Sequence, residues 1–158
     1  GTEKLYYIEN IYRLSKEIYA NDLSGKGAEI AGGRWNSKGN ATLYTGQSIA
    51  LCVTEIAVHI PLGIIPKDYR LVHIEIPDIE VFEPKRFPKD WNTFPHLDAT
   101  QKMGDKFLKE NKFLAMKVPS AAVQGEFNYI INPRNVNFKD VKIKKIEKFT
   151  FDDRFFIR

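Results

Sequence analysis

The stretch from residue 32 to residue 60 constrains the fold of this chain more than any other part of the sequence. Two glycines directly precede Arg34, and glycine permits a sharp turn or a close approach to a ligand. Residues 41–45 are short and partly β-prone, which predicts a strand. Ser48 then predicts the N-cap of a helix that ends near Pro61. The fold must therefore accommodate a tight turn, a strand and a helix in direct succession.

The predicted helix carries a carboxylate in an otherwise apolar setting. Glu55 lies in its middle, on the same side as Leu51 and His59. An ionised carboxylate seldom enters apolar surroundings unless a cation or several donors meet it. Two interpretations stay open: an exposed or ion-paired position that serves structure, and a carboxylate directed into a cleft opposite Arg34. The apolar face of this helix is broad and comprises Ile49, Cys52, Val53, Ile56 and Ile60.

The remaining elements follow from alternation and helical periodicity. We expect strands over residues 5–15, 69–76, 113–118, 126–132 and 141–151. In the last of these, Val141, Ile143, Phe149 and Phe151 are expected to share a face. A second helix is expected over 96–111, and its inward positions are Leu97, Met103 or Gln101, Phe107 and Leu108. Loops are expected at 21–31, 60–68 and 77–95.

Strands and helices alternate irregularly, which indicates an α+β fold with largely antiparallel sheets and flanking helices. The length of 158 residues and a 43% hydrophobic content suit one domain over residues 1–158. A single cysteine excludes an internal disulfide, and Cys52 is expected to be a packing residue. No apolar run approaches the ~18 residues of a membrane span, and the first residues lack the pattern of a signal peptide. We therefore expect a cytoplasmic protein without a membrane partner.

The chain is basic, with a formal charge of +4 and a pI of about 9.1. Much of the excess positive charge comes from lysines between residues 139 and 148. This pattern fits a polyanionic partner, a phosphate-bearing substrate or an acidic protein, or else a strand face kept soluble by lysine. We favour the second interpretation because no aromatic side chains suited to base stacking accompany these lysines. They are Lys139, Lys142, Lys144, Lys145 and Lys148.

Several common site signatures do not occur. The histidines at 59, 73 and 96 are scattered, and no cysteine or histidine cluster has zinc spacing, so no metal is expected. No glycine-lysine phosphate loop and no dinucleotide-binding glycine fingerprint is present. Ser120 lacks the flanking glycines of a nucleophile elbow, and from the residues alone it is interpreted as a serine that caps the turn after a strand.

A set of short fragments nevertheless occurs in a specific order along nearly the whole chain. Together these fragments resemble the RES domain, which is named for its arginine, glutamate and serine. They are Tyr12-Arg13-Leu14, Gly33-Arg34-Trp35-Asn36 with Gly39, Leu43-Tyr44, Thr54-Glu55, Val118-Pro119-Ser120, Asn132-Pro133 and Phe151-Asp152-Asp153-Arg154.

The resemblance implies a fold similar to diphtheria-type ADP-ribosyltransferase toxins. It also implies the toxin of a bacterial toxin–antitoxin pair, with an Xre-like helix-turn-helix antitoxin as its partner. The implied activity is cleavage of the nicotinamide–ribose bond of NAD+, by hydrolysis or phosphorolysis. Protein ADP-ribosylation is the alternative within the same chemistry. NAD+ is then a substrate, and no true cofactor is expected.

The resemblance also indicates which residues form the site. Such an enzyme must hold a pyrophosphate and stabilise an oxocarbenium-like transition state. Arg34, Glu55 and Tyr44 are expected to be catalytic. Glu55 would hold a ribose hydroxyl and stabilise positive charge, or orient the attacking water, phosphate or acceptor. Tyr44 would stack on the nicotinamide or its ribose, and Ser120 would hydrogen-bond the substrate or fix a catalytic neighbour. The residues expected to bind the dinucleotide are Arg13, Arg34, Tyr44, Ser120, Asn36 and Asn132.

One hypothesis comes from a different class of function. The pI and the late lysines would suit a nucleic-acid-binding module, whose affinity falls steeply with salt. We expect no direct nucleic-acid contact by this chain and assign any DNA contact to the antitoxin.

Overall fold

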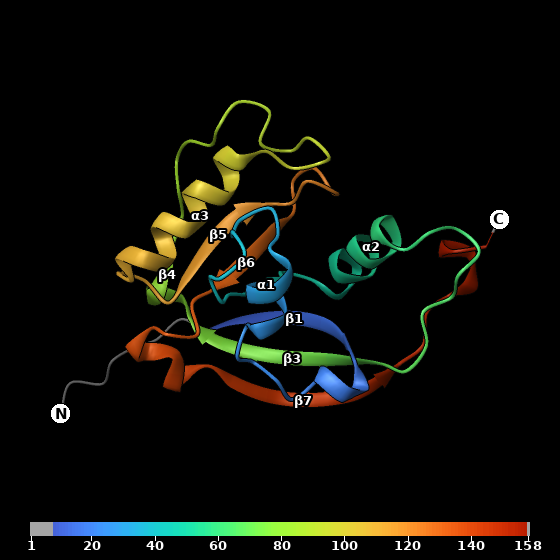
Figure 1. The fold of residues 1–158 in the computed structure, drawn as a ribbon. Helices are drawn as coiled ribbons and strands as arrows, with labels where there is room; N and C mark the ends of the chain where they lie inside the picture. The colour runs from blue at the N-terminus through green and yellow to red at the C-terminus, as the bar shows by residue number, and fades with distance from the viewer. Residues whose placement is uncertain (1–7, 158) are drawn as a thin grey trace.

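Strand-forming segments scattered along the chain assemble into one sheet. The computed structural model describes residues 8–157, and its seven-stranded sheet has the order β4-β5-β6-β2-β1-β3-β7 (Figure 1). Neighbouring strands are antiparallel except for the parallel pair β4 and β5. The strands are β1 (Ile8–Lys16), β2 (Leu43–Gly46), β3 (Tyr69–Pro77), β4 (Val81–Phe82), β5 (Ala115–Pro119), β6 (Phe127–Ile131) and β7 (Lys142–Phe149). The α-helices are α1 (Lys26–Ala31), α2 (Ile49–His59) and α3 (Asp98–Glu110).

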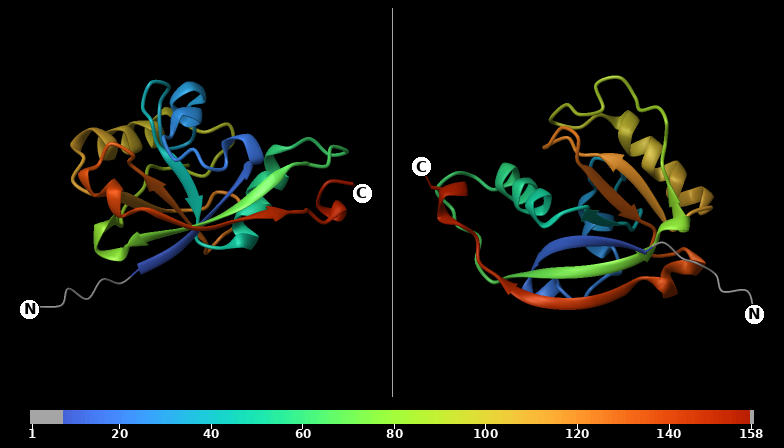
Figure 2. Two further views of the ribbon diagram at one scale, coloured as in Figure 1. Left: turned by 90° about the horizontal axis from the view of Figure 1, so that it is seen from below. Right: turned by 180° about the vertical axis from the view of Figure 1, so that it is seen from behind.

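The sheet opens between its two central strands. β1 pairs with β3 along nine residues, whereas its register with β2 consists of the single pair Tyr12 and Gly46. As a result the half made of β4, β5, β6 and β2 diverges from the half made of β1, β3 and β7 (Figure 2). Helix α2 lies beside the opening, and the Cys52 thiol donates a hydrogen bond to the Tyr12 carbonyl at 3.3 Å. This bond satisfies a backbone acceptor at the place where the strand ladder stops.

Three apolar clusters hold the two halves and their helices. The first lies along β1 and β3 and extends onto β2, β5 and β6, and its fully buried members include Ile11, Val72 and Ile131. The second joins α3 to β5 and β6 around Phe107 and Trp35. The third anchors α2 to the end of the chain and consists of Val53, Phe151 and Phe156, with partly buried neighbours. Each fully buried large side chain contributes about 1.5–3 kcal/mol relative to its exposed state.

Helix α3 makes an unusually close contact with the turn that carries Arg34. A Cβ atom at Gly104 would overlap the carbonyl oxygen of Trp35. A side chain at this position would therefore push α3 away from the turn. The indole of Trp35 is buried and stacks on Trp91 at 6.4 Å, with the ring of Phe87 at its edge.

The α+β expectation is confirmed, and most elements lie near their predicted positions. Ser48 caps α2 as predicted, because its Oγ accepts a hydrogen bond from the Leu51 backbone N–H at 3.0 Å. The strand expected over 5–15 is observed as β1, and residues 5–7 lie outside the described residues.

Some sequence expectations were wrong. The expected loop at 21–31 contains α1, which is only six residues long, has Gly27 in its first turn and lacks a side-chain N-cap. Leu97 is exposed, because it is the N-cap of α3 and lies before the helix turns inward. The expected loop at 77–95 contains the short strand β4. A bulge in the pairing of β3 with β7 breaks the expected alternation and brings Ile146 to the core beside Ile143.

Strand β7 forms one edge of the sheet and carries most of the late lysines. Two of them are ion-paired: Lys144 contacts Glu75 and Lys145 contacts Glu147, each at 3.0 Å. Lysine on an edge strand also opposes pairing with another chain. Between residues 8 and 157, no helix has the length and apolar character needed to cross a membrane.

Candidate active site

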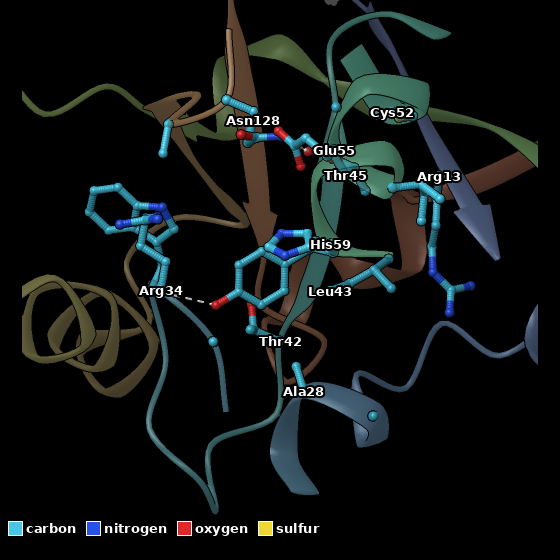
Figure 3. Close-up of a pocket in the computed structure, with 18 of the residues that line it drawn as sticks. Arg13, Ala28, Arg34, Thr42, Leu43, Thr45, Cys52, Glu55, His59 and Asn128 are labelled. Carbon is cyan, nitrogen blue, oxygen red and sulfur yellow. Dashed lines mark hydrogen bonds between the residues drawn. The ribbon is translucent and has the colours of Figure 1, made fainter. Parts of the chain in front are cut away.

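A pocket of about 940 Å³ lies where the two halves of the sheet diverge. This volume is at the upper end of the range for small-molecule sites, about 300–1,000 Å³. Its walls come from β1, α1, the turn before β2, β2 itself, α2 and the start of β6, together with the loop that precedes α3 (Figure 3). The pocket is therefore a consequence of the single-pair contact between β1 and β2.

Arg34 is held in this pocket by the loop before α3. Its Nη1 donates hydrogen bonds of 2.8 Å to the carbonyl oxygens of both Trp91 and Thr93. Burial lowers the pKa of the Arg34 guanidinium, and the charge of nearby Glu55 opposes this change. Arginine remains cationic under such a change because its ordinary pKa is so high. Both bonds use Nη1, and Nε and Nη2 have no hydrogen-bond partner within residues 8–157, so they are available as donors for a ligand.

The backbone around Arg34 is fixed by helix α3. The Gln101 amide donates to the carbonyl oxygens of Gly33 at 3.0 Å and Asn36 at 3.1 Å. The Ser37 backbone N–H donates to Asp105 Oδ1 at 2.9 Å, and the Ser37 hydroxyl donates to the same carboxylate. We call residues 33–37 the Arg34 loop. Its rigidity comes from a helix that lies far away in the sequence.

Tyr44 closes the Arg34 loop from the side of β2. Its hydroxyl donates to Asn36 Oδ1 at 2.5 Å and accepts from the Trp35 backbone N–H at 3.0 Å. A Cβ at Gly33 would lie 2.6 Å from the hydroxyl oxygen, so this contact requires glycine. Burial raises the pKa of Tyr44. The hydroxyl is thus occupied by the loop, and the ring is the part of Tyr44 available to a ligand.

Glu55 projects from α2 toward the same pocket, where Asn128 of β6 lies beside it (Figure 3). Burial raises the pKa of Glu55, whereas the Asn128 amide and the Ser120 hydroxyl oppose the rise. The Ser120 hydroxyl donates to Glu55 Oε1 at 3.2 Å. Arg34 and Glu55 therefore face one cavity, which is the arrangement expected from the functional interpretation of Glu55.

Ser120 caps a turn, as expected from the residues alone, and it contacts Glu55, whereas its predicted role in binding substrate stays a prediction. It follows β5 and caps the next turn, because its Oγ accepts from the backbone N–H groups of Ala122 and Val123 at 3.1 Å each. It also donates to Glu55 and so fixes the orientation of the carboxylate. Its own side chain is buried and lies outside the pocket lining, although Pro119 and Ala121 contribute to that lining.

Arg13 lies on the opposite side of the view from Arg34 (Figure 3). Its Nη1 donates to the carbonyl oxygens of Tyr19 and Asp22, both at 3.2 Å. Burial lowers the pKa of Arg13, and Asp22 opposes this change. Each arginine is thus anchored by a pair of loop carbonyls, and both residues line one pocket.

The two asparagines predicted to bind substrate lie outside the pocket lining. Asn36 is fully buried, and its amide donates to the carbonyl oxygens of Ala28 and Asn40 at 2.9 and 3.0 Å. Asn132 is also buried, and its amide donates to Leu108 and Asn111 near the end of α3. Asn36 therefore supports Tyr44, and Asn132 supports α3.

Other pocket residues were not predicted from the sequence. His59 follows Glu55 by one helical turn on α2, and it also lines the pocket. Asn128, Phe94 and His96 carried no local signal, because only the folded chain brings them to the pocket. Among residues 8–157, no group of three or more His, Cys, Asp or Glu side chains is arranged to hold a metal ion.

The fold and the pocket define an α+β protein with a preformed site in which two arginines and a glutamate surround a cavity. The family model of the RES domain matches residues 10–152. The chain belongs to the RES domain family, as the fragments in the sequence predicted.

Two curated relatives illustrate this membership. The chain is 37% identical over 140 residues to the "Prs ADP-ribosylating toxin" of Sphingobium sp. (strain YBL2), covering 85% of this chain and 87% of the relative. It is 34% identical over 149 residues to "Toxin Res" of Yersinia enterocolitica, covering 91% and 97%.

A solved structure has the same fold. A chain from the crystal structure of the M. tuberculosis MbcT–MbcA toxin–antitoxin complex superposes with a TM-score of 0.73. The match covers 92% of this chain and 86% of the other, at 19% sequence identity. At this level of identity the match shows the shared fold.

Proposed function

We propose that this chain is the toxin of a toxin–antitoxin pair and that it cleaves the nicotinamide–ribose bond of NAD+. The observation that carries the proposal is the convergence of Arg34 and Glu55 on one pocket of about 940 Å³. Family membership supports it, as do the names of the curated relatives, which describe toxins. We place the activity in one catalytic domain that acts in the cytoplasm.

We assign each residue a role that its geometry supports. Arg13 and Arg34 present fixed guanidinium groups that suit phosphate oxygens or the adjoining ribose. The ring of Tyr44 provides a flat apolar wall for the nicotinamide or its ribose. The carboxylate of Glu55, oriented by Ser120, faces the ribose and stabilises positive charge there.

The reaction balances without a redox partner. The bond between the nicotinamide nitrogen and the ribose C1′ breaks, and its electron pair leaves with nicotinamide, which becomes neutral. The resulting oxocarbenium-like carbon is attacked by water, by phosphate or by a nucleophile of a protein. The raised pKa of Glu55 suits it to accept the proton that a water or hydroxyl nucleophile loses.

The test is release of nicotinamide from NAD+ by the purified chain, with and without inorganic phosphate. Glu55→Ala and Arg34→Ala are each expected to lose at least ~100-fold in rate, the scale of one positioned electrostatic group. Phe82→Ala, on the far strand β4, is the matched control and is expected to keep wild-type activity. Absence of nicotinamide release by wild type under both conditions would contradict the proposal.

Transfer of ADP-ribose to a protein is the second candidate, and the name of the Sphingobium relative favours it. Labelled NAD+ in a cell lysate separates the two reactions. A discrete labelled protein that disappears with Glu55→Ala supports transfer, whereas free ADP-ribose or its phosphate supports degradation.

We further propose that an Xre-like helix-turn-helix antitoxin blocks the pocket. An acidic or flexible segment of such a protein would complement the formal charge of +4. Saturating NAD+ is then expected to weaken antitoxin binding to an inactive variant. Equal antitoxin affinity with and without NAD+ would show that the antitoxin binds away from the pocket.

A further inference from the structure

Phe94 is the most exposed large hydrophobic side chain recorded between residues 8 and 157, at 80% of its maximal exposure. It belongs to the loop between β4 and α3, and it lines the pocket. A largely exposed phenylalanine forgoes most of the free energy that burial of its ring would provide. An exposed aromatic ring at the mouth of a ligand pocket is therefore available to cover a ligand.

The ring of His59, on α2, forms a tilted aromatic pair with Phe94. The centroids of the His59 and Phe94 rings are 6.5 Å apart, with 54° between their planes. Stacked atoms lie about 3.5 Å apart, so a flat ring between two parallel rings needs a spacing of about 7 Å. His59 is also exposed and also lines the pocket (Figure 3). Small rotations of two exposed side chains would open a slot for a planar ligand.

The charged groups near this slot limit the kind of ligand that can bind there. The carbonyl of Thr93, next to Phe94, accepts one of the two hydrogen bonds from Arg34 Nη1. The cation and the ring are thus fixed to the same loop. Glu55 lies one helical turn before His59 on α2. A ligand that fits all of these groups carries an anionic group a short distance from a flat heteroaromatic ring, as nucleotides do.

We propose that Phe94 and His59 form a stacking subsite for a heteroaromatic ring of the dinucleotide, separate from the wall formed by Tyr44. This inference rests on the proposed function and deepens it, because it names the residues that select a planar ring. The loop before α3 then has two functions. The loop holds Arg34 through its backbone and contacts the ligand through Phe94.

Binding measurements test the subsite without requiring activity. Isothermal titration compares ADP-ribose, which lacks nicotinamide, with nicotinamide mononucleotide, which lacks adenine. Phe94→Ala is expected to weaken binding of one of them about tenfold, the scale of losing one base–aromatic stack. Phe94→Tyr keeps a ring and is expected to stay within about twofold of wild type. The ligand that is weakened identifies the ring that occupies the slot.

Matched variants separate stacking from other effects. His59→Phe keeps a ring without a titratable group and is expected to bind like wild type, whereas His59→Ala is expected to resemble Phe94→Ala. Phe82→Ala removes another exposed phenylalanine, from β4 and away from this pocket, and is the control. In NAD+ turnover, Phe94→Ala is expected to raise KM with a smaller change in kcat.

The outcomes distinguish this subsite from the proposed function. Wild-type affinity of Phe94→Ala for both ligands, with NAD+ still consumed, overturns the subsite and leaves the function intact. Weakened binding by Phe94→Ala without any NAD+ consumption by wild type supports the subsite and overturns the function. Absence of binding of either ligand to wild type contradicts both. If Phe94→Ala weakens only antitoxin binding, the exposed ring serves a protein partner and the subsite is wrong.

Discussion

At the scale of single residues, Glu55 shows that the pocket is maintained at a cost in stability. Burial raises the pKa of Glu55, so the folded protein binds its proton more tightly than the unfolded chain does. The contribution of Glu55 to the free energy of unfolding is therefore fully present below the ordinary pKa of glutamate. This contribution is lost as the pH rises through the raised pKa of the folded state. Above the raised pKa, the charged form of Glu55 is less favourable for the fold than the protonated form.

The first prediction concerns Glu55→Gln, which keeps the shape and removes the charge. At pH 7 we expect this variant to be more stable than wild type by about 1 kcal/mol, the usual scale for neutralising a strained functional group, while it loses catalysis. The advantage is expected to shrink as the pH falls toward 4, where wild type is protonated. Thermal unfolding at several pH values measures this. Lower stability of Glu55→Gln at pH 7 would show that the carboxylate stabilises the fold.

The second prediction concerns the Tyr44 hydroxyl, which binds Asn36 and the Trp35 backbone. Tyr44→Phe leaves both buried partners unpaired and is expected to cost about 1–3 kcal/mol of stability. Because the ring remains, KM for NAD+ should change little and kcat should fall through displacement of Arg34. The pH profile of kcat should keep its shape. Loss of one limb of that profile would instead identify the hydroxyl as an acid or base.

At the scale of elements, helix α3 acts as the support of the Arg34 loop. Gln101 and Asp105 bind backbone groups of that loop, and Gly104 lies against Trp35. Displacing a catalytic group by about 1 Å costs about 100-fold in rate. We therefore expect α3 to affect catalysis through its support of the Arg34 loop, without itself providing Arg34 or Glu55.

The third prediction follows from this support. Gln101→Ala and Asp105→Asn are each expected to lower kcat about 10- to 100-fold through misplacement of Arg34. Lys102→Ala, on the exposed side of the same helix, should have no effect. Gln101→Glu cannot donate to the two carbonyls and is expected to match Gln101→Ala. Wild-type kcat in both folded variants would show that the Arg34 loop keeps its conformation without these contacts from α3.

The same elements show what the sequence could predict. Helix α2, its N-cap and its carboxylate in an apolar setting were all predicted, because Ser48, the apolar periodicity and Glu55 are local signals. Helix α1 was missed because it is short and contains glycine. The contact of Gln101 with Gly33 joins residues 68 apart, so no local pattern could reveal it.

The site residues could likewise be predicted only in part from the sequence. Arg13, Arg34, Tyr44 and Glu55 were expected together from the ordered fragments of the RES domain, and the structure brings all four to one pocket. Asn132 was chosen for its place in a fragment, yet its amide serves the end of α3. Roles of this kind depend on where a side chain points after folding.

At the scale of the whole molecule, the basic charge is partly neutralised where it is densest. Lys144 and Lys145 on β7 form ion pairs with Glu75 and Glu147. Exposed pairs of this kind contribute little to stability, about 0–1 kcal/mol each, but they reduce the field available to a polyanion. The charge on β7 thus fits an edge strand kept soluble better than a surface for nucleic acid.

The fourth prediction is that the isolated chain does not bind nucleic acid. Electrophoretic mobility shifts with single- and double-stranded DNA and RNA at modest salt should show no complex. Binding that falls steeply as salt is raised would instead support the nucleic-acid hypothesis.

The split between β1 and β2 links the fold to the function, because it creates the pocket that both arginines and Glu55 share. The central claim is that NAD+ occupies this pocket. The most direct measurement is a crystal structure of Glu55→Gln with NAD+ bound. We expect the dinucleotide in the split, with an anionic or ribose group on Arg34 and the ribose of nicotinamide beside residue 55. NAD+ bound elsewhere on the chain, with the pocket unoccupied at saturating concentration, would contradict the account.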